Sequence, residues 1–333
     1  MIDRRLQLLR MVHEQGSIAA ASRLLHVTPP AVSQQIRQFS RELGIPLLRP
    51  HGRGVRLTEA GLALVRHADV LHAAWEEAQA ELAALDEGTE TSGHLGICGS
   101  PTAVVGLLAP GAALLRAEEP RLEVEVRETE AVDTISALLA HDADIGVVGA
   151  TLETPPMTDR RLEWAPLLDD PFDLLVPAAH RFASADEVDL ADAATEPWIV
   201  AEPGPGQVDQ LIMVACSAVG FTPHVVHRAQ EWNAVAALVG HGLGVSLLPR
   251  LAAISSEFRV VRVPLAGHPP PRRRLLTCIR RGSREHPAIS TGLDALRSVA
   301  RRIDGDLSPS RPSSEHVRTP RPRVPRHRRG QKT

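Results

Sequence analysis

Three side chains suited to hydrogen bonding with nucleic-acid bases stand on one face of the segment HVTPPAVSQQIRQFSRELG, residues 26–44. Ser33, Gln34 and Arg37 offer a hydroxyl, an amide and a guanidinium, and an arginine can pair bidentately with guanine in the major groove. The opposite face is apolar, because Val32, Ile36, Phe39 and Leu43 follow one another at helical spacing. The segment therefore predicts a helix that packs on one side and offers hydrogen-bonding groups on the other.

The residues before this helix predict how it begins and what it packs against. Thr28 suits the N-cap, and Pro29 follows at the first helical position, where a proline costs nothing. Upstream, apolar residues at helical spacing predict two more helices, one through Leu6, Leu9 and Val12 and the other through Ile18, Ala21, Leu24 and Leu25. Helices joined by short turns in this way are typical of a helix-turn-helix unit. The alternative is a three-helix bundle whose polar face is merely solvated.

The segment RPHGRGVRLTEAG, residues 49–61, predicts a hairpin-like wing beside that helix. Arg53 and Arg56 lie on its arms, where arginines suit phosphates or a narrow minor groove. The predicted DNA contacts are Thr28, Pro30, Ser33, Gln34, Arg37, Arg53 and Arg56. Residues 1–66 contain ten arginines against four acids, whereas residues 67–303 contain 33 acids against 19 arginines. This asymmetry predicts that only the basic segment, residues 1–66, binds a polyanion.

A long helix is predicted to follow, capped by Thr58. Its apolar residues alternate spacings of four and three, which is typical of a helix that pairs with another helix: Leu64, Ala68, Leu71, Trp75, Ala78, Leu82 and Leu85. Glu76, Glu77 and Glu81 lie outside this stripe and are expected to face water. The alternative is a single amphipathic helix packed on its own domain.

After residue 93 the pattern changes to short apolar strands alternating with helices, which indicates a parallel α/β architecture. Ligands of such sheets bind beyond the carboxyl ends of the strands. The predicted ligand contacts are Ser100, Thr102, Thr129, Pro203, Gly204, Trp232 and Asn233. Their hydroxyls and free backbone N–H groups favour a small carboxylate, whereas Glu128 would suit an amine. The alternative for each is a role in capping its loop.

Several classes of function lack support in the sequence. It contains no P-loop, HExxH, GxSxG or CxxC motif, so we predict no enzyme activity, no metal and no cofactor. Three cysteines stand far apart in apolar contexts and are expected to be buried and inert. No apolar run is long enough to span a membrane, and charges interrupt any signal-peptide core, so we expect a cytoplasmic protein that binds no membrane.

Residues 16–61, GSIAAASRLLHVTPPAVSQQIRQFSRELGIPLLRPHGRGVRLTEAG, resemble the DNA-binding signature of the LysR-type transcriptional regulators. The resemblance implies an N-terminal all-α winged helix-turn-helix with a long linker helix, then an α/β two-lobed periplasmic-binding-protein-like effector domain. It also implies double-stranded DNA and a small-molecule effector as partners, and a homodimer through the linker helix that pairs into a homotetramer. It strengthens the case for Ser100, Thr129 and the Pro203 region as effector contacts.

The predicted boundaries follow from these patterns together. Residues 1–58 form the winged helix-turn-helix, 59–87 the linker helix, 88–93 a hinge and 94–303 the effector domain. The resemblance implies two lobes within it, with lobe I at about residues 94–165 and 273–303 and lobe II at about residues 166–272. Residues 304–333, rich in Pro, Arg and Ser, are expected to be a disordered basic tail. This tail is either a solvated appendage or a source of non-specific attraction to DNA.

The chain departs from the family pattern at three places. Pro29-Pro30 stands where Gln-Pro is common, Leu48 where an aromatic residue is common, and Pro50 where an arginine is common. Loss of the glutamine removes one possible base contact, so the operator cannot be inferred from relatives. Two rival functions use the lobes alone: a solute-binding receptor, or an enzyme.

Overall fold

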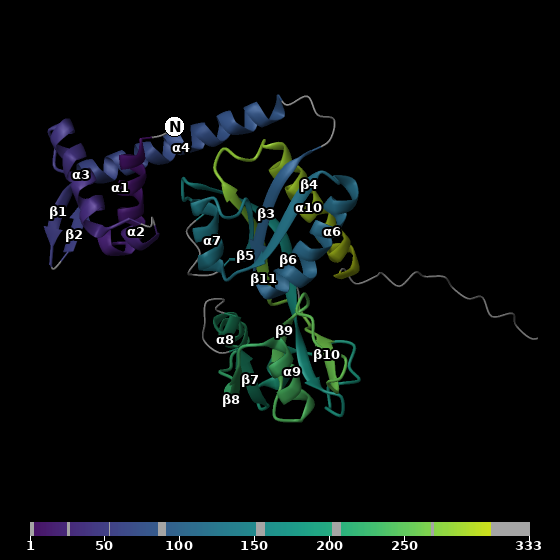
Figure 1. Ribbon diagram of the computed structural model, residues 1–333. Helices are drawn as coiled ribbons and strands as arrows, with labels where there is room; N and C mark the ends of the chain where they lie inside the picture. Colours follow the sequence, from purple (N-terminus) through teal and green to yellow (C-terminus); the bar gives the residue numbers. More distant parts are fainter. Residues whose placement is uncertain are drawn as a thin grey trace, which may run out of the picture.

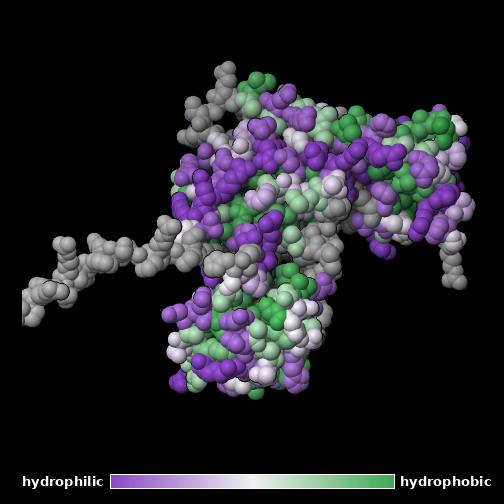
Figure 2. All heavy atoms as spheres, turned by 180° about the vertical axis from the view of Figure 1, so that it is seen from behind, coloured by the Kyte–Doolittle hydropathy of each residue, from purple (hydrophilic) through white to green (hydrophobic). Residues whose placement is uncertain are grey.

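A computed structural model of the chain describes residues 3–24, 27–52, 54–85, 91–150, 157–201, 208–267 and 270–307. Figure 1 shows a small N-terminal domain, a long helix that leads away from it, and two lobes, one above the other. In the space-filling view from behind, the N-terminal domain projects sideways from the lobes (Figure 2).

The N-terminal domain consists of three helices and a hairpin. The helices are α1 (Arg4–Glu14), α2 (Ile18–Leu24) and α3 (Pro29–Leu43), and the strands β1 (Leu48–His51) and β2 (Gly54–Leu57) pair antiparallel. One apolar core joins them, with Leu9, Val32 and Ile36 almost fully buried. Gly44 ends α3 in the left-handed conformation with φ of 69°, which a glycine adopts at little cost. The predicted helix-turn-helix with a wing is confirmed.

The long helix α4 (Glu59–Ala84) begins at Thr58, whose hydroxyl accepts a hydrogen bond from the Gly61 N–H at 3.1 Å. Most of its predicted apolar stripe faces outward: Leu71, Trp75, Leu82 and Leu85 are 42–73% exposed. Glu76 was expected to face water, and this expectation was wrong, because only 7% of Glu76 is exposed. The opposite side of α4 lies against lobe I, which covers that carboxylate.

Lobe I is built on a mixed sheet. Strands β3 (Gly93–Gly99), β4 (Leu122–Glu128) and β5 (Ile145–Gly149) are parallel, as predicted, but β11 (Arg272–Arg280) and β6 (Leu162–Pro177) continue the sheet antiparallel. Helices α6 (Ala109–Glu118) and α10 (Pro287–Leu307) cover one face, and α7 (Ala131–Ala140) covers the other. Helix α10 continues four residues into the segment predicted to be disordered. The rest of that segment, 308–333, lies outside the described residues.

Lobe II contains β7 (Pro197–Ala201), β8 (His224–Ala229), β9 (Ser246–Pro249) and β10 (Val260–Pro264), with α8 (Val208–Ala218) and α9 (Trp232–Gly240). Strand β6 joins the two lobes. Residues Leu162–Pro171 pair with β11 in lobe I, and Phe172–Pro177 pair with β9 and β10 in lobe II. Because β6 runs through this junction and β11 begins at it, these are the elements about which the lobes can change their relative angle. The two-lobed α/β architecture predicted from sequence is confirmed.

Candidate nucleic-acid interface and effector site

Helix α3 presents the predicted polar face to solvent. Gln34 and Arg37 are exposed, while Val32, Ile36 and Phe39 anchor the other side in the core. Thr28 caps the helix by accepting a hydrogen bond from the Ala31 N–H at 3.4 Å. The apolar core and the Thr28 cap therefore fix the position of α3, and its polar face is accessible to a ligand.

Ser33 and Arg37 are already joined to each other. The Arg37 Nη2 donates to Ser33 Oγ at 2.7 Å, one helical turn away. This bond holds the guanidinium along the helix, which lowers the conformational entropy it would lose on binding a base. The half-buried serine hydroxyl accepts this bond, so its O–H and its second lone pair stay available for a base contact.

A shallow groove runs between α3 and β1. It is lined by Pro30, Gln34, Arg37, Ser40, Arg41, Pro46 and Leu48. Three of these residues were predicted to contact DNA, whereas Arg41 was not. Its signal was present in the sequence, since Arg41 follows Arg37 by one helical turn. Ser40 has a structural role, because its hydroxyl accepts from the Leu47 N–H at 3.2 Å.

The wing places two arginines directly opposite each other. Arg56 on β2 is the pairing partner of Arg49 on β1, and both are exposed. Like charges at paired positions of a hairpin repel, so an anion bound between or above them would stabilise the arrangement. Arg49 was not among the predicted contacts, because its partner becomes apparent only from the strand register. Arg53 was predicted and lies outside the described residues.

The predicted effector contacts of lobe I gather at the carboxyl ends of β3 and β4. The Ser100 and Thr102 hydroxyls are 3.3 Å apart, and the Thr129 N–H donates to the Gly99 carbonyl at 2.9 Å. Ser100 precedes α5 (Pro101–Ala103), and its side chain makes no hydrogen bond that caps this helix. The Thr129 hydroxyl lies 2.7 Å from that of Thr134 on α7. Ser100 and Thr129 therefore share one edge of the sheet.

The predicted contacts of lobe II are less uniform. Trp232 packs partly against the apolar core around α9, and the Asn233 Oδ1 accepts from the Ser255 N–H at 3.0 Å. Asn233 is thus used in holding a loop. Burial raises the pKa of Glu130, and the neighbouring carboxylates of Glu128 and Asp133 raise it further. Glu231, which precedes Trp232 in lobe II, adds a smaller effect in the same direction. Pro203 and Gly204 lie outside the described residues.

A buried ion pair that the sequence did not reveal stands at the junction of the lobes. Arg273 on β11 and Asp170 on β6 are 8% and 0% exposed, and the Arg273 Nε donates to Asp170 Oδ2 at 2.9 Å. The same guanidinium donates through Nη2 to the Thr102 hydroxyl at 2.8 Å, and the Leu251 N–H donates to Asp170 Oδ1 at 3.0 Å. Thr102 is therefore tied to the junction and is 5% exposed. Its role as a direct effector contact stays a prediction.

The helix that carries Thr102 continues into a π-helical turn, Val104–Leu108. Such turns are rare and are frequent at functional sites. Gly106 in this turn lies against the Leu251 side chain of lobe II, and a β-carbon at Gly106 would collide with it. Helix α5 thus contacts β11 through Arg273, and the π-helical turn that follows it contacts lobe II through Leu251.

The three cysteines, Cys98, Cys216 and Cys278, are buried and unpaired. Burial raises the pKa of each thiol, to about 12 for Cys216. Within the described part of the chain, no group of three His, Cys, Asp or Glu side chains is arranged to hold a metal ion. Over the same residues, no helix combines the length and the apolar character needed to cross a membrane.

Comparison with known families matches both halves of the chain. The family described as "LysR substrate binding domain" matches residues 88–301. The family described as "Bacterial regulatory helix-turn-helix protein, lysR family" matches residues 4–62. The two matches fall on the two-lobed domain and on the N-terminal domain described above.

Curated relatives and solved structures extend these matches. The HTH-type transcriptional regulator AlsR of Bacillus subtilis is 29% identical over 258 residues, covering 75% of this chain and 80% of that protein. The DNA-binding transcriptional dual regulator OxyR of Escherichia coli is 29% identical over 304 residues, covering 91% and 96%. A full-length OxyR variant from Pseudomonas aeruginosa shares the fold, with a TM-score of 0.61, 21% identity and coverage of 90% of this chain and 97% of that chain.

Proposed function

Since the chain belongs to the LysR family of transcriptional regulators, we propose that α3 reads a specific double-stranded DNA operator and that a small effector in the two-lobed domain controls this binding. The observation that carries the proposal is the exposed polar row of α3 beside the paired arginines of the wing. Gln34 and Arg37 supply hydrogen bonds to base edges in the major groove. Arg49, Arg53 and Arg56 hold the phosphate backbone and supply the salt-dependent part of the affinity.

We propose that α4 forms the dimer. Its outward stripe exposes Leu71, Trp75, Leu82 and Leu85, together with Val70 at 57%. A row of large apolar side chains on a helix of 26 residues is costly to leave in water. In Figure 2, apolar patches interrupt the polar surface along the upper edge of the molecule, where α4 runs. Two copies paired through this stripe would present two α3 helices to half-sites related by a two-fold axis, and two such dimers would form the tetramer.

We propose that the effector binds between the lobes, at the shared edge of Ser100 and Thr129. Hydroxyl and backbone N–H donors favour a carboxylate at this edge. Glu128, Glu130 and Glu231 surround the same region and would suit an amine on the same molecule. Effector binding would shift the population of inter-lobe angles about β6 and β11.

Some relatives carry the name "Hydrogen peroxide-inducible genes activator", but the thiols of this chain argue against a peroxide sensor of the cysteine type. Sensor cysteines are accessible and have a low pKa. Cys98, Cys216 and Cys278 are all buried, and each has a raised pKa. We therefore favour a bound metabolite as the signal. Because the proposed ligand is a genomic operator, we expect the protein to act in the cytoplasm and to catalyse no reaction.

The test is a selection of genomic DNA fragments by the full-length protein at moderate salt, repeated with a panel of small carboxylates, amines and amino acids. We expect enrichment of a few fragments, including DNA upstream of the protein's own gene, and a change in their affinity with one class of metabolite. Enrichment no better than bulk competitor DNA would refute the proposal. Catalytic turnover of a metabolite by the protein lacking residues 1–90 would instead support the enzyme alternative.

A further inference from the structure

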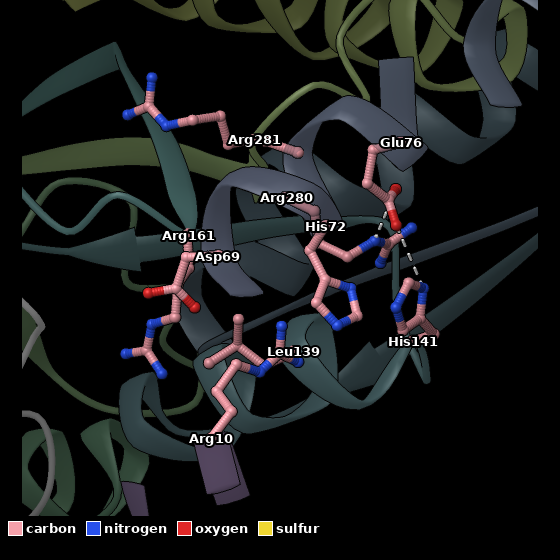
Figure 3. Close-up of a pocket in the computed structure, with 10 residues that line it drawn as sticks. Arg10, Asp69, His72, Glu76, Leu139, His141, Arg161, Arg280 and Arg281 are labelled. Atoms are coloured by element: carbon pink, nitrogen blue, oxygen red, sulfur yellow. Dashed lines mark hydrogen bonds and ion pairs between the residues drawn. The ribbon is translucent and has the colours of Figure 1, made fainter. Parts of the chain in front are cut away.

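Helix α4 is fastened to lobe I of its own chain by a buried polar contact (Figure 3). The Arg280 Nε donates to Glu76 Oε2 at 3.1 Å, and the His141 Nδ1 lies 3.7 Å from Glu76 Oε1. Glu76 and Arg280 are only 7% and 9% exposed. Glu76, His141 and Arg280 are called the docking contact below.

Lobe I holds Arg280 in place independently of α4. Its Nη2 donates to Asp144 Oδ1 at 2.9 Å, and its Nη1 donates to the carbonyls of Leu138 and Ala143 at 3.2 and 2.6 Å. Only the Nε is directed to Glu76. Because lobe I already orients the guanidinium, Arg280 is a preorganised binding site for one carboxylate from α4.

The backbone of lobe I near Arg280 allows α4 to pack closely against it. His141 ends α7 with φ of 62°, and it is the one non-glycine residue with positive φ within the described ranges. A glycine is usual at such a position, so His141 is held there at some cost in backbone strain, with its imidazole beside Glu76. Gly282, with φ of 92°, lies against the backbone of Ala73, and any side chain at Gly282 would collide with that carbonyl.

The docking contact is small and polar rather than part of a core. A narrow cavity on one side is lined by charged groups of the N-terminal domain, α4 and lobe I, and a groove flanks the other side. Their polar residues include Arg10, Asp69, His72, Arg161 and Arg281 on one side and Gln79, His94, Asp144, Ser283 and His286 on the other. A buried ion pair contributes little net stability once its desolvation cost is counted, so an interface centred on such a pair can open at modest cost.

We propose that Glu76, His141 and Arg280 are positioning residues that hold α4 reversibly against lobe I and thereby set the orientation of the DNA-binding domain relative to the effector domain. Helix α4 transmits this orientation, because its first turns belong to the N-terminal core through Val65, which is 5% exposed. The same helix carries the outward stripe on its other side. The effect on operator binding rests on the proposed function, whereas the docking itself does not.

The proposal predicts that acid releases the contact. Burial and the neighbouring Arg10 lower the pKa of His72 from 6.5 to about 4, and the His72 Nε2 is buried without a hydrogen-bond partner among the described residues. Burial and Arg280 also lower the pKa of His141, although Glu76 acts in the opposite direction. The charged groups that face these two imidazoles are Arg10, Asp69, Glu76, Asp144, Arg161, Arg280 and Arg281. Docking is then favoured above pH 6.5 and is lost as the pH falls from 6.5 towards 4.

The size of this response follows from the His72 pKa. If His72 regains its ordinary pKa when α4 is released, lowering the pH from 7.5 to 5.5 shifts the equilibrium between docked and released forms by up to about tenfold towards release. Tenfold is an upper limit, because the His72 ring is partly exposed and solvent reduces the change in its pKa.

The test measures the distance between the two domains in the full-length protein without DNA. Spin labels are attached at Gln15→Cys on the N-terminal domain and Glu118→Cys on α6, both exposed positions. The three natural cysteines are buried and should react slowly. Labelled chains are diluted into excess unlabelled protein, so that distances within one chain dominate, and double electron–electron resonance gives the distance distribution.

At pH 7.5 we expect one narrow distance for the parent protein. Glu76→Gln should shift the docked-to-released ratio by about tenfold, as expected for loss of a charge-assisted bond, and Glu76→Lys should shift it further. Glu81→Lys, on the exposed side of the same helix, is the matched control and should leave the distribution unchanged. Acidification to pH 5.5 should broaden the parent distribution, and the pair His72→Gln and His141→Asn should remove this response.

Two results would overturn the proposal. One is a distribution that Glu76→Lys leaves identical to that of Glu81→Lys. The other is a release on Glu76→Lys that leaves the affinity for the selected operator fragment unchanged, because the contact would then hold α4 without positioning the DNA-binding domain. If the parent protein selects no DNA fragment, the proposed function fails, but the distance measurement still tests the docking.

Discussion

At the scale of single residues, the proposed contacts to DNA come from a few side chains whose positions the backbone has already fixed. Arg37 is held by Ser33 at 2.7 Å, and Arg56 stands opposite Arg49 in the wing. The first pair restrains a guanidinium that can reach a base edge, whereas the second concentrates positive charge that a phosphate would neutralise. The two pairs should therefore respond differently to mutation.

Replacement of Arg37 by alanine is expected to relax operator preference at one base position. A bidentate arginine–guanine pair is worth about 1–3 kcal/mol of discrimination against the wrong base. Binding selection from a randomised operator library would measure this loss. Arg116→Ala, exposed on α6, serves as the control with the same change of charge. An equal weakening of all sequences would show that Arg37 contacts the backbone instead.

Replacement of Arg56 by alanine is expected to weaken binding to all sequences alike. The slope of log K against log salt concentration should become shallower by about one, because one fewer phosphate is neutralised. The free protein should not lose stability, since the change removes repulsion with Arg49. Arg53→Ala is expected to have the same effect on the slope. A slope that stays the same for both variants would mean that the wing makes no phosphate contact.

At the scale of elements, a helix or contact could be predicted from sequence when the interactions that form it lie within one segment of the chain. Helix α3 could be predicted with its N-cap at Thr28, because capping and apolar spacing lie within one segment. The burial of Glu76 could not be predicted, because the spacing of apolar residues gives the faces of a helix but not the domain that packs against each face. Asp170 and Arg273 are 103 residues apart, and only the register of β6 with β11 brings them together.

Replacement of Thr102 by valine is expected to test the junction between the lobes. The change keeps the shape of the side chain but removes the acceptor of one Arg273 Nη2 hydrogen, while the same nitrogen stays 2.8 Å from Asp170 Oδ2. A buried donor left unpaired costs about 1–3 kcal/mol, which urea unfolding of the full-length protein would measure. Ser136→Ala, on the exposed side of α7, is the control. Unchanged stability would show that water replaces the hydroxyl and that Thr102 is available for an effector.

At the scale of the whole molecule, one helix connects the DNA-binding domain, the proposed dimer seam and the effector domain. The N-terminal turns of α4 belong to the DNA-binding domain, its outward stripe is proposed to pair with a second copy, and its inner side meets lobe I at Glu76. The lobes themselves are joined through β6 and β11, whose buried ion pair contacts the effector-side helix α5. A change in inter-lobe angle thus has a physical route to α4 through lobe I.

Introduction of aspartate at Leu82, which is 65% exposed, is expected to disrupt the dimer without unfolding the chain. A charge placed in a helix-pairing seam must be desolvated in the dimer but stays in water in the monomer. Sedimentation velocity would report a shift towards monomer, and Ala84→Asp, at an exposed position of the same helix outside the stripe, is the control. A dimer that persists in the Leu82 variant would locate the interface elsewhere.

The most direct test of the central claim, that a two-fold pair of α3 helices reads an operator, is a footprint of the full-length protein on its selected DNA fragment. Two protected half-sites related by inverted symmetry are predicted, with their centres about one helical turn, or a multiple of it, apart on the duplex. Protection of a single site without an inverted partner, or no protection above that of bulk DNA, would contradict the account.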